Sequence, residues 1–307
     1  MIGINVVILQ KNWEMRIKSN RIEDIVKFAL SELEGIYSEN EIKQLTYSLI
    51  THFCNIPKTS ILANSKQTVL ESELLKLNFA IKDLKKDALP IFKKEKPLQY
   101  IIGYTDFYNI KLNLNHKVLI PRPETEELVD MIIKENKGRK DLKIADFGCG
   151  SGAIALALKK NIPESEICAF DIDDNAINQT KENAQSLNLD INIEKKDLLK
   201  DNFNDYNFDI IVSNPPYVME KEKSLMRDNV LNHEPHQALF VKDENPLIFY
   251  QAIERIAQKN LKPKGKIYME INESLSESTK NVFKDYDTKI IKDLFGKYRF
   301  IRAEKLA

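Results

Sequence analysis

The N-terminal third of the chain places hydrophobic residues at helical spacing. Over residues 22–33 they recur every three or four positions, and Gly35 ends the segment. Two further runs with this spacing cover about residues 41–53 and 67–88. Because each run has an apolar stripe that must be buried, the pattern predicts that these helices pack together as a small bundle.

The pattern changes around residues 105–120. Apolar and polar residues alternate there, which is typical of half-buried strands. We expect a β-hairpin at this position, which would link the helical bundle to the rest of the chain.

From residue 142 onward, short apolar runs alternate with helical segments. The expected strands are 142–147, 166–172, 191–195, 208–213, 266–271, 289–294 and 299–305, and the expected helices are 151–161, 175–187, 246–261 and 273–283. This alternation is typical of an α/β fold with a mainly parallel, doubly wound sheet and right-handed crossovers.

Length, composition and charge exclude several classes of protein for this chain. The chain has 307 residues, 46 basic and 46 acidic side chains, and 43% hydrophobic residues. This length predicts about two domains, and the composition excludes wholesale disorder. No apolar stretch approaches the ~18 residues of a membrane span, so no membrane association is expected. The balanced charge argues against a nonspecific nucleic-acid binder, although a local basic face is compatible with it.

Neither disulfides nor a metal site are expected. The three cysteines are Cys54, Cys149 and Cys168. They are too few and too widely spaced for a disulfide framework or a zinc knuckle, so a reducing cytoplasm is the natural location. His233 and His236 have Pro235 between them, which breaks the helix that would align them as ligands, and no third ligand is apparent.

Residues 146–152 form a glycine-rich loop between an expected strand and an expected helix. Such a loop turns tightly and lets a ligand approach main-chain N–H groups. Asp171 ends the next expected strand, where it would accept hydrogen bonds from ribose hydroxyls. The loop fits a dinucleotide as well as S-adenosylmethionine. Gly152 and Asp146 favour S-adenosylmethionine, since an acidic residue suits its ammonium and sulfonium charges.

The expected strand 208–213 runs directly into Asn214-Pro215-Pro216-Tyr217. An Asn oxygen and a proline carbonyl oxygen can accept both hydrogens of a planar NH₂ group, which aims its nitrogen at a donor methyl. The ring of Tyr217 can stack on that group. Such positioning supplies up to about 7–11 kcal/mol of the help that an amide nitrogen, a poor nucleophile, needs. A plain turn at the end of the strand is the alternative interpretation.

These residues resemble those of the HemK/PrmC family, methyltransferases that act on the glutamine of peptide chain release factors. The likeness extends over nearly the whole chain after Met15. It is carried by the segments 97–107, 118–126, 146–158, 208–218, 234–239 and 293–299. The resemblance suggests that Arg122 and Glu124 border the substrate channel, whereas helix capping alone would also explain them.

The resemblance implies a role for each site residue. Donor binding would fall to Gly148, Cys149, Gly150, Ser151, Gly152, Asp171, Leu198 and Asn214. Substrate binding would fall to Asn214, Pro215, Pro216 and Tyr217, with Asn214, Pro215 and Tyr217 as the catalytic residues. Leu198 stands where the family often has an aromatic residue near the adenine, so an apolar contact would replace stacking.

The resemblance also implies a domain organisation. It predicts a helical substrate-binding domain over residues 15–102, a β-hairpin linker over 103–120, and a class I methyltransferase domain of about seven strands over 121–307. The helical pattern begins only after Met15, so residues 1–14 are expected to be an N-terminal extension.

The sequence therefore predicts S-adenosylmethionine-dependent methylation of the glutamine in the Gly-Gly-Gln motif of release factors. Methylation of a ribosomal-protein glutamine and adenine-N6 methylation of DNA or RNA pose nearly the same geometric problem and remain alternatives. A nicotinamide-dependent oxidoreductase and a noncatalytic partner that only holds release factors are the alternatives outside methyl transfer.

Overall fold

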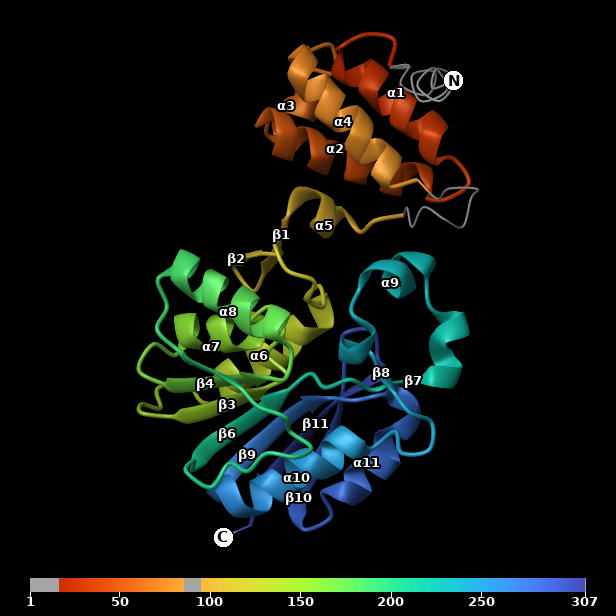
Figure 1. Ribbon diagram of the computed structural model, residues 1–307. Helices are drawn as coiled ribbons and strands as arrows, with labels where there is room; N and C mark the ends of the chain where they lie inside the picture. Colours follow the sequence, from red (N-terminus) through yellow and green to blue (C-terminus); the bar gives the residue numbers. More distant parts are fainter. Residues whose placement is uncertain (1–16, 86–94, 307) are drawn as a thin grey trace, which may run out of the picture. The chain divides into compact units, whose positions relative to one another are not determined.

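The computed structural model describes residues 17–85 and 95–306 (Figure 1). The expected extension over residues 1–14 lies outside these ranges. The described residues form two compact units that divide between Ile102 and Gly103. None of the described helices is long and apolar enough to cross a membrane.

The first unit consists of helices. They are α1 (Ile22–Leu33), α2 (Glu39–Cys54), α3 (Lys58–Ala63), α4 (Glu71–Asp83) and α5 (Leu98–Ile102). Ser38 starts α2 with a capping box, and the apolar stripes of the helices form one buried core that includes Ile25, Leu49 and Leu77. The helices predicted over 22–33 and 41–53 are confirmed.

The third predicted helix is shorter than expected, and two short helices, α3 and α5, were missed. Thr68 forms an isolated bridge with Arg21, so α4 begins only at Glu71. The end of the prediction, residues 86–88, lies outside the described ranges. Helix α3 has 6 residues, too few for the periodic pattern to reveal it.

The second unit contains a seven-stranded sheet with the order β10-β11-β9-β6-β3-β4-β5. Its strands are β3 (Lys143–Phe147), β4 (Glu166–Asp171), β5 (Asn192–Lys195), β6 (Phe208–Ser213), β9 (Leu261–Glu270), β10 (Tyr286–Lys292) and β11 (Tyr298–Lys305). All neighbours pair in parallel from β9 to β5, whereas β11 is antiparallel to both β9 and β10. The predicted α/β fold with a mainly parallel sheet is confirmed.

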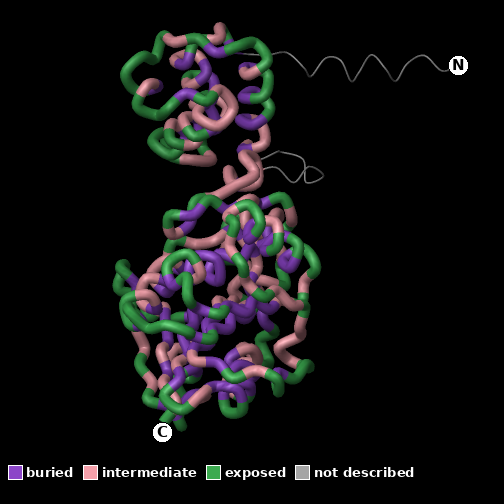
Figure 2. Tube along the Cα trace, turned by 90° about the vertical axis from the view of Figure 1, so that its left-hand side faces the viewer, coloured by how far each residue is buried: buried purple, intermediate pink, exposed green. Residues whose placement is uncertain are grey.

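Helices cover both faces of this sheet (Figure 1). The helices α6 (Pro123–Glu135), α7 (Ala153–Asn161) and α8 (Asp174–Leu187) pack on one face, and α10 (Ile248–Asn260) and α11 (Ser276–Val282) pack on the other. The sheet is therefore buried on both sides, which explains why its strands are continuous apolar runs. Figure 2 shows the buried positions along the middle of this unit.

The hairpin predicted around residues 105–120 is confirmed over its first half. Strands β1 (Tyr104–Phe107) and β2 (Ile110–Asn113) are joined by Tyr108 and Asn109, both with positive φ. Two such residues make the tight turn that matches the twist of a hairpin. The strands pack into the core of the second unit through Phe107, Ile110 and Leu112.

A long insertion separates β6 from α10. It contains two short paired strands, β7 (Val218–Met219) and β8 (Phe240–Val241), the helix α9 (Asp228–His233) and two short 3₁₀ helices. The sequence predicted no elements in this segment, because each is too short to show a period.

Candidate functional site

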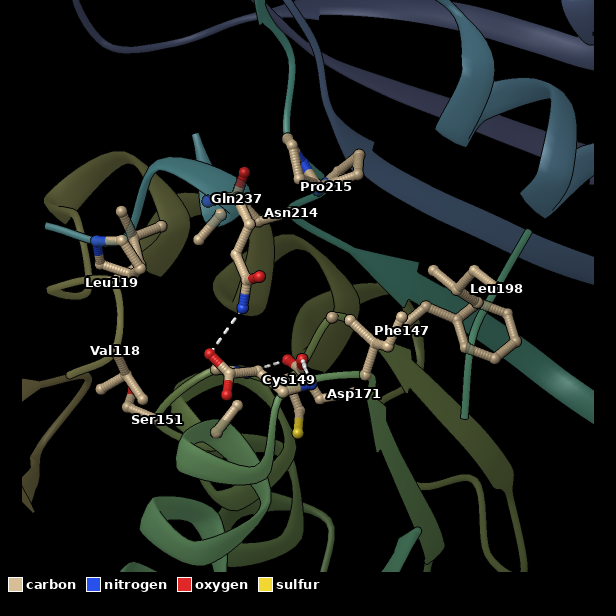
Figure 3. A pocket seen from close by; sticks show the side chains of 18 of the residues that line it. Val118, Leu119, Phe147, Cys149, Ser151, Asp171, Leu198, Asn214, Pro215 and Gln237 are labelled. Atoms are coloured by element: carbon tan, nitrogen blue, oxygen red, sulfur yellow. Dashed lines mark hydrogen bonds between the residues drawn. The ribbon is translucent and has the colours of Figure 1, made fainter. Parts of the chain in front are cut away.

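A cavity of about 420 Å³ lies where β3, β4 and β6 end (Figure 3). Ligands of parallel α/β sheets bind at this edge, because the loops at the carboxyl ends of the strands leave a crevice there. The predicted site residues that line the cavity are Gly148, Cys149, Gly150, Ser151, Asp171, Leu198, Asn214, Pro215 and Pro216. The fold thus brings together segments that are up to about seventy residues apart in sequence.

Main-chain hydrogen bonds hold the glycine-rich loop in place. The N–H groups of Gly148 and Cys149 both donate to the carbonyl oxygen of Phe170, at 2.8 and 3.0 Å. Gly152 begins α7 with a φ of 81°, and a Cβ at this position would lie 2.9 Å from Thr180 Cγ2. A side chain is therefore excluded there. Gly152 does not line the cavity but shapes the loop that does.

Asp171 ends β4 at the edge of the cavity. Its Oδ2 accepts a hydrogen bond from the Gly150 N–H at 3.0 Å, and its Oδ1 accepts one from the Asp173 N–H at 3.0 Å. Burial raises the pKa of this carboxyl, and the main-chain hydrogen bonds act against that rise. Each carboxylate oxygen has a second lone pair, so both oxygens can still accept hydrogen bonds from hydroxyl groups of a ligand.

Asp146 lies behind the loop and not on the cavity wall. Its side chain is fully buried, and its Oδ2 accepts a hydrogen bond from the Ala155 N–H in the first turn of α7 at 3.1 Å. Its Oδ1 has no partner in the described part of the protein, and burial raises the pKa of the carboxyl to about 7. Asp146 thus lies beside the cavity without lining it, and its side chain anchors the start of a helix; its suitability for a charged ligand stays a prediction.

The Asn214 side chain extends from the end of β6 into the cavity (Figure 3). Its Nδ2 donates to Thr125 Oγ1 at 3.2 Å, and the Thr125 hydroxyl in turn donates to Glu270 Oε1. Thr125 belongs to the first turn of α6, and Glu270 is the last residue of β9. Three elements therefore meet at the amide of Asn214.

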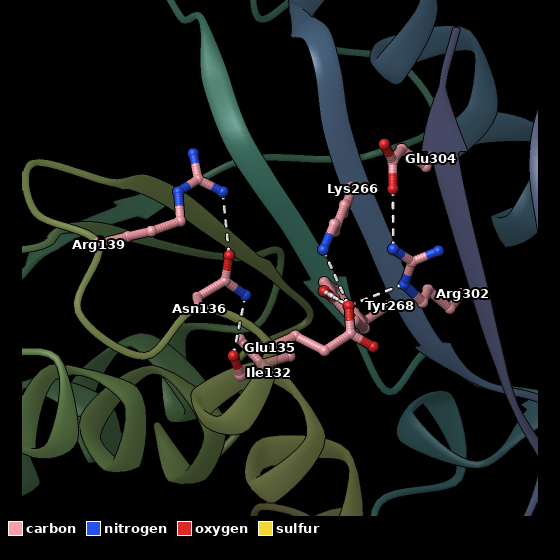
Figure 4. Close-up of polar contacts among 8 residues, drawn as sticks. All are labelled: Ile132, Glu135, Asn136, Arg139, Lys266, Tyr268, Arg302 and Glu304. Atoms are coloured by element: carbon pink, nitrogen blue, oxygen red, sulfur yellow. Dashed lines mark hydrogen bonds and ion pairs between the residues drawn. The ribbon is translucent and has the colours of Figure 1, made fainter.

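The other end of α6 is tied to the same strand (Figure 4). Glu135 Oε2 accepts hydrogen bonds from Lys266 Nζ at 2.9 Å, from the Tyr268 hydroxyl at 2.9 Å and from Arg302 Nε at 2.8 Å. Burial raises the pKa of Glu135, but these three donors together bring it below its usual value. Helix α6 is thus attached to β9 at both ends, which fixes the position of Thr125.

A further part of the cavity wall comes from Arg122, just before α6, and from Gln237, in the segment between β6 and α10. Arg122 forms an ion pair with Glu234 at 2.6 Å, and the Glu234 side chain is only 1% exposed. Gln237 donates a hydrogen bond to Asp173 Oδ2 at 2.6 Å. Arg122 lines the cavity and Glu124 does not, and a place at the substrate channel stays a prediction for both.

Tyr217 also lies outside the cavity wall. Its carbonyl oxygen accepts a hydrogen bond from Asn272 Nδ2 at 3.1 Å. Burial raises the pKa of its phenol, and the facing guanidinium of Arg299 opposes that rise. The loop that starts at Asn214 is therefore anchored at both of its ends.

Sequence reasoning missed some residues of the cavity wall. Thr125, Gln237 and Phe249 line the cavity. The one available signal for Thr125 was its place in the segment 118–126. For Gln237 it was likewise its place in the segment 234–239, whereas Phe249 follows no motif and only the folded chain reveals it. Among the described residues no group of three or more His, Cys, Asp or Glu side chains is arranged to hold a metal ion.

Comparisons with known proteins agree with this geometry. The family model of the Methyltransferase small domain matches residues 124–239. A release factor glutamine methyltransferase of Flavobacterium psychrophilum is 38% identical over 277 residues, which cover 88% of this chain and 94% of the relative. One of Bacteroides thetaiotaomicron is 36% identical over 292 residues, which cover 92% of this chain and 99% of the relative.

The chain belongs to the release factor glutamine methyltransferase family. A solved structure, the hMettl16 catalytic domain in complex with a 3'UTR hairpin, shares the fold alone. It is 16% identical, with a TM-score of 0.52, and the match covers 65% of this chain and 77% of that chain. Membership in a methyltransferase family decides against the nicotinamide-dependent oxidoreductase and the noncatalytic partner.

In this family member, truncation of Glu135 should destabilise the fold. Glu135→Ala leaves Lys266 and Arg302 without their shared partner, and both side chains are less than a fifth exposed. We expect the free energy of unfolding to fall by about 1–3 kcal/mol, measured by urea titration. The control is Glu164→Ala, which removes an exposed pair with Lys140 and should change it by less than about 0.5 kcal/mol. Equal effects of the two variants would contradict the anchoring role.

Asp146 should make the stability depend on pH. Its pKa is about 7 in the folded protein against an ordinary value of 3.8, so the folded protein holds a proton that the unfolded chain releases. The contribution is most favourable below about pH 4 and is lost as the pH rises to about 7. Between pH 5 and pH 8 the wild type should lose about 2–3 kcal/mol relative to Asp146→Asn. Parallel stability curves in denaturant titrations would contradict this.

Proposed function

We propose that the protein transfers a methyl group from S-adenosylmethionine to the side-chain nitrogen of a glutamine. The proposed substrate is the Gly-Gly-Gln motif of peptide chain release factors. The observation that carries the proposal is the Asn214 amide, which reaches into the same cavity as the glycine-rich loop and Asp171. One cavity thus offers a place for the donor and a hydrogen-bonding group for the acceptor.

The donor half of the cavity has the chemistry that S-adenosylmethionine requires. We propose that Asp171 accepts hydrogen bonds from the ribose hydroxyls and that Leu198 contacts the adenine. Residues 148–151 would form the wall of the donor half, and Asn214 would close the site toward the acceptor. When bound, the cofactor supplies a methyl group on a positively charged sulfur, which makes that carbon electrophilic.

The acceptor half has to hold a flat NH₂ group. Asn214 Oδ1 and the Pro215 carbonyl oxygen would accept its two hydrogens, so that its nitrogen faces the donor. The nitrogen–carbon bond forms as the carbon–sulfur bond breaks, and the amide then releases one proton to solvent. The two oxygens favour the positive charge that develops on nitrogen in the transition state.

Other roles in the proposal rest on the family resemblance. Pro216 would contact the substrate, and the stacking of Tyr217 on the amide stays a prediction. We propose that the helical unit up to residue 102 binds the release factor, that the hairpin region 103–120 links it to the catalytic residues 121–307, and that the enzyme works in the cytoplasm. The three cysteines are free, which is compatible with a reducing location.

Labelled methyl donor tests the proposal directly. The full chain is incubated with labelled donor and purified release factors, and the modified peptide is mapped by mass spectrometry. Label on the glutamine of the Gly-Gly-Gln motif supports the proposal. Label only on a ribosomal protein, or on adenine of DNA or RNA offered in the same assay, would replace it with one of the alternatives.

Two substitutions should separate the two halves of the cavity. Asn214→Ala removes the acceptor of the amide hydrogens, so transfer should fall at least about 100-fold while donor affinity changes much less. Asp171→Ala removes the ribose contact and should weaken donor affinity above all. Calorimetry of donor binding and single-turnover kinetics distinguish these results. Unchanged turnover by the first variant, or unchanged donor affinity in the second, would contradict the assigned roles.

A further inference from the structure

The Asn214 amide is held by a chain of two buried side chains. Asn214 Nδ2 donates to Thr125 Oγ1 at 3.2 Å, and the Thr125 hydroxyl donates to Glu270. Thr125 is 4% exposed and Glu270 is 1% exposed, so the contact between these two side chains is shielded from water. Strand pairing places Ser213 beside Met269, which brings the next residues, Asn214 and Glu270, to the same edge of the sheet.

An ionised Glu270 fixes the direction of the two hydrogen bonds that run from Asn214 through Thr125 to Glu270. An ionised carboxylate only accepts, so the single hydrogen of the Thr125 hydroxyl is committed to Glu270. Thr125 Oγ1 can therefore only accept a hydrogen bond from Asn214, so the NH₂ group of Asn214 must face it. The amide oxygen then lies on the other side of the group.

The proposed reaction needs this orientation and fails with the opposite one. A glutamine NH₂ group brings two hydrogens, so its partner has to be an oxygen. If the Asn214 amide were flipped, two NH₂ groups would face each other, and the acceptor nitrogen would lose its alignment. Rotation about the last bond of an Asn side chain is a soft motion, so something must select the orientation.

We propose that Thr125 and Glu270 are positioning residues that hold the Asn214 amide with its oxygen toward the substrate nitrogen. The inference rests on the proposed function. Neither residue touches the reacting atoms by this account. Helix α6 contributes the hydroxyl at its first turn, and its attachment to β9 through Glu135 at the last turn keeps that hydroxyl in place.

Protonation of Glu270 reverses the direction of both hydrogen bonds. A protonated carboxyl can donate to Thr125, whose hydroxyl then turns its hydrogen to Asn214 Oδ1. The charged and titratable groups facing Glu270 are Arg122, Glu124, Tyr217, Tyr250 and Arg299. Burial raises the pKa of Glu270 to about 7, although Thr125 and Arg299 oppose that rise. Turnover of the wild type should therefore fall as the pH drops below about 7.

The experiment compares single-turnover kinetics of the full chain and its variants with a release factor from pH 5.5 to 8.5. Thr125→Val keeps the shape of the side chain and removes the hydroxyl. Its kcat should fall about 10- to 100-fold at pH 8, with donor affinity unchanged in calorimetry. Its residual turnover should also lose the pH dependence of the wild type, because the carboxyl no longer reaches Asn214.

Three variants make the comparison specific. Thr125→Ser restores the hydroxyl and should bring kcat back to within about threefold of the wild type. Glu270→Gln keeps a partner for Thr125 but cannot ionise, so the fall of turnover at low pH should disappear. Thr279→Val is the matched control, because Thr279 is fully buried in α11 and its hydroxyl has no partner in the described structure. Its kcat and pH profile should match the wild type.

Wild-type kcat and pH dependence in Thr125→Val, or a low-pH fall that persists in Glu270→Gln, would overturn the inference while the proposed function stands. No transfer by the wild type to any release factor glutamine would overturn the proposed function, and the inference with it. If Thr125→Val does not fold, the pH profile of Glu270→Gln alone decides.

Discussion

The contact between the first turn of α6 and the end of β9 is the constraint on which the acceptor side of the site depends. Thr125 and Glu270 meet there in a buried hydrogen bond, and Asn214 is held by the same hydroxyl. A buried polar group without a partner is destabilising, so these three side chains stabilise one another only as a set. The end of β6 therefore takes its place from a helix and a strand that lie before and after it in the sequence.

The donor side is built on a separate set of contacts. Asp146 and Gly152 shape the glycine-rich loop from behind, and Asp171 fixes it from the end of the neighbouring strand. Within the described part of the chain, no direct hydrogen bond joins these residues to Thr125, Glu270 or Asn214, and the two sets share the cavity and the sheet. Under the proposed function, the donor half and the acceptor half of the cavity are therefore positioned by separate contacts.

The features that could be predicted from the sequence are those that a contiguous local pattern encodes. Strand–helix alternation, the glycine-rich loop and Asn214-Pro215-Pro216-Tyr217 identified the sheet and the parts of the cavity wall at the ends of β3 and β6, because each is contiguous in the chain. The hydrogen bond of Asp146 to the start of α7 was not predicted, since a leading acid looks the same whether it faces a ligand or a helix end. Glu270 comes from a segment without a motif, and only tertiary packing brings it to Thr125. Short elements such as α3 and α9 were missed because they span too few residues to show a period.

The proposed function depends above all on an oriented Asn214 amide that holds the substrate nitrogen. The most direct measurement is a crystal structure of the full chain with the demethylated donor product and a peptide that contains Gly-Gly-Gln. The account predicts that the glutamine nitrogen lies within about 3.2 Å of both Asn214 Oδ1 and the Pro215 carbonyl oxygen, with Asn214 Nδ2 still on Thr125. A glutamine bound away from residue 214, or one whose carbonyl oxygen contacts Asn214 in place of its nitrogen, would contradict it.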